Sequence, residues 1–275
     1  MARTLTGDTL IERLFVAPGR RGQLRDQHAN NTFGWEKHEA IAMLEENRQK
    51  LSDLQYKLYA DGRHALLVVL QAIDAGGKDG TVHDIFTAMN PQGCVVTSFK
   101  APTAEELKHD YLWRVHQRVP PRGMVGVFNR SHYEDVLIVR VERLVPEEVW
   151  RERYAQINEF ERMLTTNSVR IIKLFLQISK KEQKERMEDR LRDPNRRWKF
   201  SPEDLVKRRQ WAEYQKAFEA MLTRCSTRHA PWYVIPADRK WFRNVAVSEI
   251  LVKEMGGLPL RFPEPAYDPS KIRVR

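Results

Sequence analysis

The sequence has little cysteine and no long apolar segment. It contains two cysteines, Cys94 and Cys225, which are far apart and form no C-x-x-C pair. A disulfide scaffold or a structural zinc site is therefore not expected, and a reducing compartment is favoured. No apolar run approaches the roughly 20 residues of a membrane-spanning helix, and the first residues lack the apolar core of a secretory signal. We expect a cytoplasmic protein that does not enter membranes.

Charge of one sign is in excess. Lysine and arginine number 47 against 37 aspartates and glutamates, which gives a net charge of +10. This balance favours a polyanionic partner: nucleic acid, an anionic membrane or a phosphate polymer. The 275 residues are 41% hydrophobic, enough for a substantial core. We expect a basic N-terminal arm (1–36), one domain (37–257) and an irregular proline-rich tail (258–275).

The most informative stretch is residues 65–81. An apolar run ends at Ile73, and a glycine-rich turn carrying Lys78 follows. The N–H groups of such a turn and the positive end of the next helix bind anions, and the lysine adds a full charge. The match to the phosphate-loop pattern G-x-x-x-x-G-K-[ST] is incomplete, because Ala72 and Asp79 replace the first glycine and the hydroxyl residue. The alternative is an ordinary turn with a solvated lysine.

Strands and helices are expected to alternate along the chain. Strands are predicted at residues 65–73, 94–99, 124–128, 169–178 and 232–235. Helices are predicted at residues 37–60, 81–89, 101–119, 146–164, 180–191, 201–222 and 238–254. This order indicates an α/β fold with a central parallel five-stranded sheet between two helical layers, and ligands at the carboxyl ends of the strands. The arginine-rich residues from about 180 to 205 are expected to form a helical lid.

Three acids are candidates for a metal site. Asp74 lies inside the glycine-rich turn, and Glu134 and Asp135 follow the third strand. Mg²⁺ takes few direct carboxylates, and adjacent helical residues do not point the same way, so one of the pair should face the metal. We assign Asp74 and Asp135 to Mg²⁺, although Asp74 could instead stabilise the turn. Asn129 ends the third strand, where such proteins usually carry an acid, which moves the acidic role to the later residues.

Several cations are candidates for phosphate contacts. Arg130 is placed to clamp phosphate, with a structural salt bridge to Glu134 or Asp135 as the alternative. The densest basic cluster consists of Arg186, Arg190, Arg197, Lys199, Lys207, Arg208 and Arg209. Interleaved acids make a salt-bridged surface the alternative for most of them. We expect Arg190 and one or two of Arg196, Arg197 and Lys199 to close over phosphate. His132 is expected to be structural rather than a phosphohistidine.

Together these motifs resemble the polyphosphate kinase 2 family. The segments that carry the resemblance are QAIDAGGKDGT (71–81), SFKAPT (98–103), DYLWRVH (110–116), FNRSHYED (128–135), RWKF (197–200) and WYVIPAD (232–238). The likeness extends from about Phe15 to the last helix. Asn129 with Glu134 and Asp135 is similar to the class III branch, whose members phosphorylate both AMP and ADP. Ala72 departs from the usual glycine, which a negative φ would make tolerable.

The resemblance implies a thymidylate-kinase-like P-loop fold and a reversible, Mg²⁺-dependent transfer between polyphosphate and a nucleotide. Direct in-line transfer without a phosphoenzyme is expected. The residues expected to act in catalysis are Asp74, Lys78, Arg130, Glu134, Asp135 and Arg190. Those expected to bind polyphosphate are Gly76, Gly77, Lys78, Asp79, Gly80, Thr81, Arg130, Arg190, Arg197, Lys199 and Arg208. Those expected to bind the acceptor nucleotide are Lys100, Arg114, Arg118 and Asn129.

The expected partners are polyphosphate and adenine nucleotides, with guanine nucleotides left open, and a second copy of the chain in a homo-oligomer. Neither a membrane nor nucleic acid is expected as a partner. Two other functions stay under consideration. One is an ATP-dependent nucleoside monophosphate kinase on the same fold, which the charge of +10 disfavours because one ATP does not need so basic a surface. The other is a non-catalytic nucleic-acid-binding P-loop protein, for which no recognised module is present.

Overall fold

A computed structural model describes residues 5–274. Within them the chain forms a six-stranded sheet in the order β1-β6-β5-β2-β4-β3. The strands are β1 (Phe15–Val16), β2 (Ala65–Gln71), β3 (Cys94–Ser98), β4 (Val125–Asn129), β5 (Val169–Gln177) and β6 (Trp232–Pro236). All seven residues of β2 are buried, since this strand lies between β4 and β5 in the middle of the sheet.

The prediction of a parallel five-stranded sheet was wrong in one respect. The five predicted strands are present and parallel. A sixth, β1, pairs antiparallel with β6 and makes the sheet mixed, with Phe15 opposite Tyr233. Two residues are too short for a periodic pattern, and β1 is a strand only because distant β6 offers its edge. Part of the basic N-terminal arm thus adds to the sheet.

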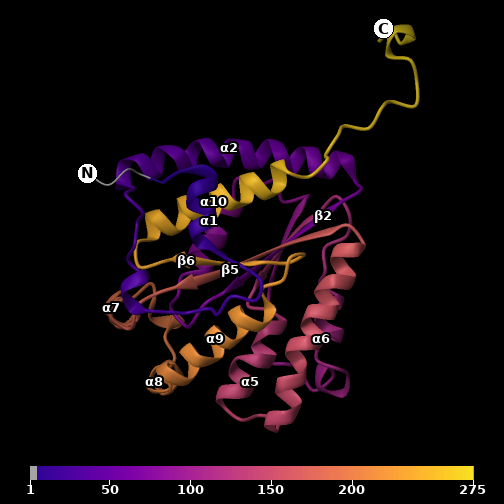
Figure 1. Ribbon diagram of the computed structural model, residues 1–275. Coiled ribbons are helices and arrows are strands. Elements are labelled where there is room, and N and C mark those ends of the chain that lie inside the picture. Colours follow the sequence, from indigo (N-terminus) through magenta and orange to yellow (C-terminus); the bar gives the residue numbers. More distant parts are fainter. Residues whose placement is uncertain (1–4, 275) are drawn as a thin grey trace.

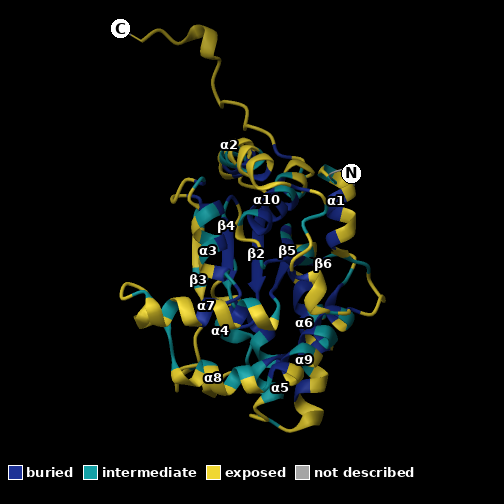
Figure 2. Ribbon diagram, turned by 90° about the vertical axis from the view of Figure 1, so that its left-hand side faces the viewer, coloured by how far each residue is buried: buried dark blue, intermediate teal, exposed yellow. Residues whose placement is uncertain are grey.

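Helices cover both faces of this sheet. The α-helices are α1 (Gly7–Leu14), α2 (Lys37–Asp61), α3 (Lys78–Thr81), α4 (Trp113–His116), α5 (Ile138–Val141), α6 (Glu147–Thr166), α7 (Lys180–Arg192), α8 (Pro202–Arg209), α9 (Trp211–Cys225) and α10 (Lys240–Gly256). In Figure 1, α1, α2 and α10 lie on one side of the sheet, and α5, α6 and α9 on the other. Figure 2 shows the buried strands between these layers, with the C-terminal segment extending away from them.

Two of the predicted helices are not continuous in the structure. Thr103 and Glu106 form the expected capping box, at 2.7 and 3.2 Å between side-chain oxygen and backbone nitrogen. However, the helix predicted for 101–119 is a 3-10 turn (Glu106–Lys108) followed by α4, because residues 101–110 are mostly exposed and have no apolar face to bury. The helix predicted for 201–222 is divided at Gln210 into α8 and α9.

The predicted N-terminal ends of the helices agree better with the structure. Ser179 caps α7 by accepting a hydrogen bond from the N–H of Glu182, and Ser201 caps α8 from Glu203. The helix expected from Thr81 begins earlier, at Lys78, and continues into a π-helical turn (Val82–Phe86). Among residues 5–274, no helix is both long and apolar enough to cross a membrane.

Candidate active site

The site is built where three parallel strands end side by side. Asn129, the last residue of β4, pairs with Leu70 of β2 on one side and with Ser98 of β3 on the other. The carboxyl ends of these strands therefore lie at one edge, as predicted. The glycine-rich turn follows β2 at this edge, and Arg130 follows β4. Two segments far apart in sequence thus meet because the sheet register brings them together.

The glycine-rich turn contains two residues with left-handed backbone. Ala75 has φ +63° and Gly77 has φ +101°, both in the left-handed region, and Gly77 is the N-cap of α3. Ala72 is not among the described residues with positive φ. Its methyl group therefore needs no glycine-specific backbone, which confirms the expectation that this departure from the motif is tolerated.

Lys78 is buried at the start of α3, with 8% of its surface exposed. Its Nζ donates to the carbonyl of Ala72 at 2.8 Å and to that of Ile73 at 3.5 Å. Burial, together with the charge of Arg130, lowers the pKa of Lys78 to about 8, although Asp74 opposes the shift. The solvated-lysine alternative is excluded by this position, and the ammonium group lies inside the loop.

Asp74 is surrounded by cations. Its Oδ1 accepts a hydrogen bond from Nη2 of Arg130 at 2.7 Å, and its Oδ2 lies 3.7 Å from Nζ of Lys207. Burial raises the pKa of Asp74, but the charges of Lys78, Arg130 and Lys207 outweigh it and hold the pKa below its usual value. Arg130 thus forms a salt bridge, but with Asp74 rather than with Glu134 or Asp135, and its guanidinium lies at the edge of the loop.

The two acids after β4 have different surroundings. Glu134 lines a small cavity together with Asp74, Arg130 and Lys207. Asp135 instead accepts a hydrogen bond from Nη1 of Arg153 at 2.8 Å. Burial raises the pKa of Asp135 to about 6 even though Arg153 opposes the shift. Glu134, rather than Asp135, is the acid that shares a cavity with Asp74.

In residues 5–274 no group of three or more acids, histidines or cysteines is placed to hold a metal ion. Mg²⁺ commonly binds through one or two carboxylates, several waters and substrate phosphates. The pair of Asp74 and Glu134 at one cavity fits that donor set, because the oxygen ligands can be completed by a phosphate chain. The geometry therefore suits a metal that arrives with its substrate.

One of the predicted lid residues, Lys199, lies beside the glycine-rich turn. Nζ of Lys199 lies 3.9 Å from Oδ2 of Asp79, whose Oδ1 accepts a hydrogen bond from Asn129 at 2.8 Å. Arg190 lies 3.6 Å from Asp204 and donates to the carbonyl of Lys199 at 3.3 Å. The lid residues thus reach the start of α3 through Lys199.

Other predicted cations are held within the lid. Arg197 donates to the carbonyl of Leu191 at 2.9 Å, and Arg196 pairs with Asp193 at 3.0 Å. Arg208 donates to Lys180 and Gln183, each at 2.8 Å. These contacts leave Arg196, Arg197 and Arg208 engaged with neighbouring parts of α7 and its loop.

A large cavity of about 980 Å³ shares Arg130, Glu134 and Lys207 with the small cavity beside Asp74. The predicted acceptor residues Lys100 and Arg114 line it, whereas Arg118 is exposed and does not. Arg114 donates twice to the carbonyl of Lys100 at 3.0 Å. The remaining wall mixes apolar residues with carboxylates; the apolar residues include Val139, Leu144, Val145, Val149 and Val206, and the carboxylates are Glu106, Asp110, Glu134, Asp135, Glu142, Glu152 and Glu203. The cavity therefore offers cationic, acidic and apolar contacts.

Beneath the segment after β4 lies a fully buried polar network. Lys173 of β5 and Glu161 of α6 pair at 2.5 Å, and neither side chain is exposed. Tyr133 donates to Glu161 at 2.8 Å, and His132 lies 3.1 Å from the same carboxylate. His132 is therefore a structural residue, as expected, because its ring is enclosed by this network.

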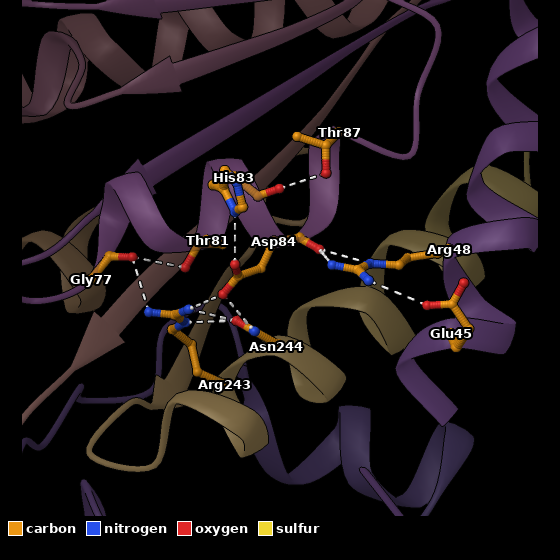
Figure 3. A network of polar contacts seen from close by, with 9 residues as sticks. All are labelled: Glu45, Arg48, Gly77, Thr81, His83, Asp84, Thr87, Arg243 and Asn244. Atoms are coloured by element: carbon orange, nitrogen blue, oxygen red, sulfur yellow. Dashed lines mark hydrogen bonds and ion pairs between the residues drawn. The ribbon is translucent and has the colours of Figure 1, made fainter. Parts of the chain in front are cut away.

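Sequence reasoning missed three residues near the loop. Arg243 of α10 and Gln183 of α7 contact loop carbonyls, and Arg153 holds Asp135. Figure 3 shows Arg243 directed at Gly77, Asp84 and Asn244. No local pattern marks these residues, because each contact joins segments far apart in the chain.

Comparison with known proteins agrees with the motifs. The family model described as Polyphosphate kinase 2 (PPK2) matches residues 34–259. An AMP/ADP-polyphosphate phosphotransferase of Meiothermus ruber is 51% identical over 261 residues, which cover 94% of this chain and 98% of that protein. An ADP-polyphosphate phosphotransferase of Rhodopseudomonas palustris is 44% identical over 247 residues, covering 85% of this chain and 86% of that protein.

A solved structure shares the fold over nearly the whole chain. Polyphosphate Kinase 2 from Arthrobacter aurescens TC1 is 42% identical and superposes with a TM-score of 0.92. The match covers 98% of this chain and 97% of that one. Both helical layers and the mixed sheet thus have a counterpart of known structure.

Proposed function

This chain belongs to the polyphosphate kinase 2 family, and from this membership we propose that it transfers the terminal phosphoryl group of inorganic polyphosphate to AMP and to ADP. The relative that is 51% identical over almost the whole of both chains is named for both acceptors. The same enzyme can run in reverse, because the transfer exchanges one phosphoanhydride bond for another.

The observation that carries this proposal is the position of Arg130. Its guanidinium pairs with Asp74 of the phosphate loop and also lines the 980 Å³ cavity. A donor phosphate in the loop and an acceptor nucleotide in the cavity would therefore meet at one cation. Phosphoryl transfer requires this arrangement, since its transition state needs alignment and positive charge more than covalent help.

The donor end of the polymer would bind in the glycine-rich turn. Its backbone N–H groups and the start of α3 attract anions, and Lys78 supplies a charge from inside the turn. Gly76, Gly77, Asp79, Gly80 and Thr81 would contribute backbone and side-chain contacts around the terminal phosphates. Lys199 and Lys207 already lie beside Asp79 and Asp74, so they would meet the next phosphates along the chain.

Mg²⁺ would be held by Asp74 and by one of the two acids after β4. Glu134 shares the small cavity with Asp74, while Asp135, our original assignment, is paired with Arg153. The ion would neutralise charge on the transferred phosphoryl group. Arg130 would turn from Asp74 toward that group, and Arg190 would approach it from the lid.

The acceptor would occupy the large cavity. Lys100 and Arg114 supply cationic contacts suited to the nucleotide phosphates, and the apolar part of the wall, which includes Val139 and Leu144, suits the base. Asn129 would help to orient the acceptor from the end of β4. A cavity of this size admits either AMP or ADP, with the longer phosphate chain extending toward Arg130.

Closure of the segment from about 180 to 205 over the loop would exclude water, which would otherwise accept the phosphoryl group. Domain limits of 37–257, a cytoplasmic location and assembly into a homo-oligomer are further parts of this proposal. Light scattering of the purified chain measures the assembly directly.

The decisive experiment is an assay with polyphosphate, AMP and Mg²⁺, with formation of ADP and ATP followed by chromatography. We expect both products, and loss of both when Lys78 is replaced by alanine or when the metal is chelated. A parallel assay with ATP and AMP but no polymer is the control. If ATP readily phosphorylates AMP while polyphosphate yields nothing, the protein is an ATP-dependent nucleoside monophosphate kinase and the proposal is wrong.

A further inference from the structure

The carbonyl groups of the glycine-rich turn are held partly by its own residues and partly by side chains from distant helices. Lys78 donates to the carbonyl of Ala72, and Thr81 donates to that of Gly77 through its N–H at 2.9 Å and its hydroxyl at 3.1 Å. A loop that binds phosphate directs its N–H groups at the ligand, so its carbonyl groups must point away. The left-handed residues Ala75 (φ +63°) and Gly77 (φ +101°) bend the chain in this region. Because the turn is largely buried, its outward carbonyls need hydrogen-bond donors, and the carbonyls of Asp74 and Ala75 receive theirs from another helix.

Arg186 of α7 is one such donor. Only 8% of its surface is exposed, and its Nη1 donates to the carbonyl of Ala75 at 3.0 Å. Its Nη2 donates to the carbonyl of Ala237, after β6, at 2.5 Å. Its Nε pairs with Glu182 one turn earlier at 2.7 Å. The guanidinium thus joins the loop to the end of a second strand.

Arg243 of α10 approaches the loop from another helix. Its exposure is 1%, and its Nη1 donates to the carbonyl of Gly77 at 3.1 Å (Figure 3). Its remaining donors are used by Asp84 at 3.1 Å and by Asn244 at 2.6 and 2.9 Å. Asn244 in turn donates to Asp84 at 2.8 Å, so the guanidinium is fixed in one orientation.

The guanidinium of Arg243 also occupies the space beside Gly77. A Cβ atom added to Gly77 would lie 2.5 Å from Nη1 of Arg243 and 3.3 Å from Nη1 of Arg186. Gln183, one turn before Arg186, extends the pattern by donating to the carbonyl of Asp74 at 3.0 Å. Side chains from α7 and α10 therefore hold the carbonyls of Asp74, Ala75 and Gly77.

We propose that Arg186 and Arg243 are positioning residues that set the phosphate-binding loop in its receptive form before the ligand arrives. They hold two carbonyl groups outward, and the N–H groups of the loop then face the anion. Each guanidinium nitrogen of the two arginines already donates to a protein oxygen, so we assign them to the backbone of the loop rather than to the donor. The inference rests on the proposed function only in taking a phosphate chain as the ligand of this loop.

The test compares Arg186→Met and Arg243→Met with Arg162→Met, an exposed arginine on α6 outside the site. Three quantities are measured for each variant: the Kd of tripolyphosphate by calorimetry, the KM values for polyphosphate and AMP, and the thermal midpoint. We expect both loop variants to bind tripolyphosphate about tenfold more weakly and to raise the polyphosphate KM by about the same factor, with the AMP KM within about twofold. Arg162→Met should match the wild type.

A second experiment distinguishes a positioning role of the arginine from a general effect on the stability of the protein. In Arg186→Ala, added guanidinium ion should restore part of the tripolyphosphate affinity, and methylammonium, a cation of the wrong shape, should not. If a methionine variant does not fold, the lysine variant replaces it. Lysine keeps the positive charge, but its ammonium group lacks the planar arrangement of N–H donors that arginine uses here. The same selective rise in the polyphosphate KM is expected of it.

Two results would overturn the inference. One is a folded loop variant with wild-type tripolyphosphate affinity and polyphosphate KM. The other is an equal rise of both KM values with no rescue by guanidinium. Failure of the proposed function gives a different result, since a wild-type protein that binds tripolyphosphate but makes no ATP still allows the affinity measurements to be compared.

Discussion

Arg130 and Asp74 are joined by a hydrogen bond of 2.7 Å between Nη2 and Oδ1, across the gap between the ends of β4 and β2. Arg130 has a φ of +62°, a left-handed conformation that is unfavourable for a residue with a side chain. The ion pair holds this residue where the phosphate loop and the large cavity meet. Any ligand that binds Asp74 or Arg130 must therefore compete with, or rearrange, this contact.

Replacement of Asp74 by asparagine tests this relationship. Asparagine keeps an oxygen for Arg130 but removes the charge that a metal would need. We expect kcat to fall by about 100-fold or more, the range found when one electrostatic contact to the transition state is lost. The measurement is steady-state kinetics at several Mg²⁺ concentrations, with the exposed Asp53→Asn as the control. An unchanged Mg²⁺ requirement would remove Asp74 from the metal site.

The buried ammonium group of Lys78 predicts proton uptake on ligand binding. Its pKa is lowered to about 8, so the free protein loses this charge as the pH rises through that value. A bound phosphate favours the charged form and raises the pKa again. Tripolyphosphate affinity should therefore decline above pH 8, and at about pH 8.5 binding should take up a fraction of a proton.

Calorimetry in two buffers of different ionisation enthalpy measures this uptake. The terminal phosphates of tripolyphosphate also titrate, so the uptake assigned to Lys78 is the difference between the wild type and Lys78→Arg, whose side chain stays charged at both pH values. At pH 6.5 the lysine is charged before binding, and its contribution should vanish. Equal values of this difference at both pH values would show that Lys78 is not the titrating group.

We expect replacement of Asp135 to increase the stability of the protein and to decrease its activity. Its pKa is raised to about 6, mainly by burial, whereas an unfolded aspartate titrates near 3.9. A raised pKa means that protonated Asp135 is the favoured form, and this stabilisation is lost as the pH rises through about 6. Asp135→Asn should therefore increase the free energy of unfolding by roughly 2 kcal/mol at pH 8, and by far less at pH 4.

Urea denaturation at both pH values provides this comparison, and activity is measured on the same samples. We expect the variant to be more stable and less active at pH 8. A variant that is less stable at pH 8 would mean that the ion pair with Arg153 outweighs the burial of the carboxylate.

The pair formed by Lys173 and Glu161 should behave as a buried unit. Lys173→Met leaves Glu161 buried without its cation, which should cost about 3–5 kcal/mol of unfolding free energy. In the double variant with Glu161→Leu, much of this loss should be recovered, although Tyr133 loses its acceptor. Arg162→Met removes an exposed pair with Glu159 and should leave the free energy of unfolding almost unchanged. Additive effects in the double variant would contradict the pairing.

The fold could largely be predicted from the sequence because its central strands are continuous apolar runs. β2 and β5 are buried nearly throughout, and this pattern is visible in the chain itself. β1 could not be predicted, since Phe15 and Val16 are a strand only through pairing with β6, more than 200 residues away. The long helix expected after Ala101 was wrong for the opposite reason. Its capping signal is genuine, but its residues have no buried face.

The site, like the fold, could be predicted from the sequence only where its residues lie in one motif or follow neighbouring strands. Lys78 and Asp74 lie in one motif, and Arg130 follows the neighbouring strand, so parallel-sheet geometry predicts that they converge. Arg186 and Arg243 contact the same loop from 111 and 166 residues away. A single sequence marks neither contact, since an arginine that binds a backbone carbonyl needs no particular residue type opposite it. The carbonyl contacts of the loop were therefore visible only in three dimensions.

Ala72→Gly and Gly77→Ala make opposite changes in the same loop and should have unequal effects. Ala72 does not have a positive φ, so glycine there restores the usual motif and only loosens the unfolded chain, at about 0.5–1 kcal/mol of stability. We expect activity within about twofold of the wild type. Gly77 has a φ of +101°, and a Cβ atom there would lie 2.5 Å from Arg243. Alanine must displace either the loop or the guanidinium, so tripolyphosphate binding should be lost. If both variants bind tripolyphosphate equally well, the loop does not depend on the left-handed turn at Gly77.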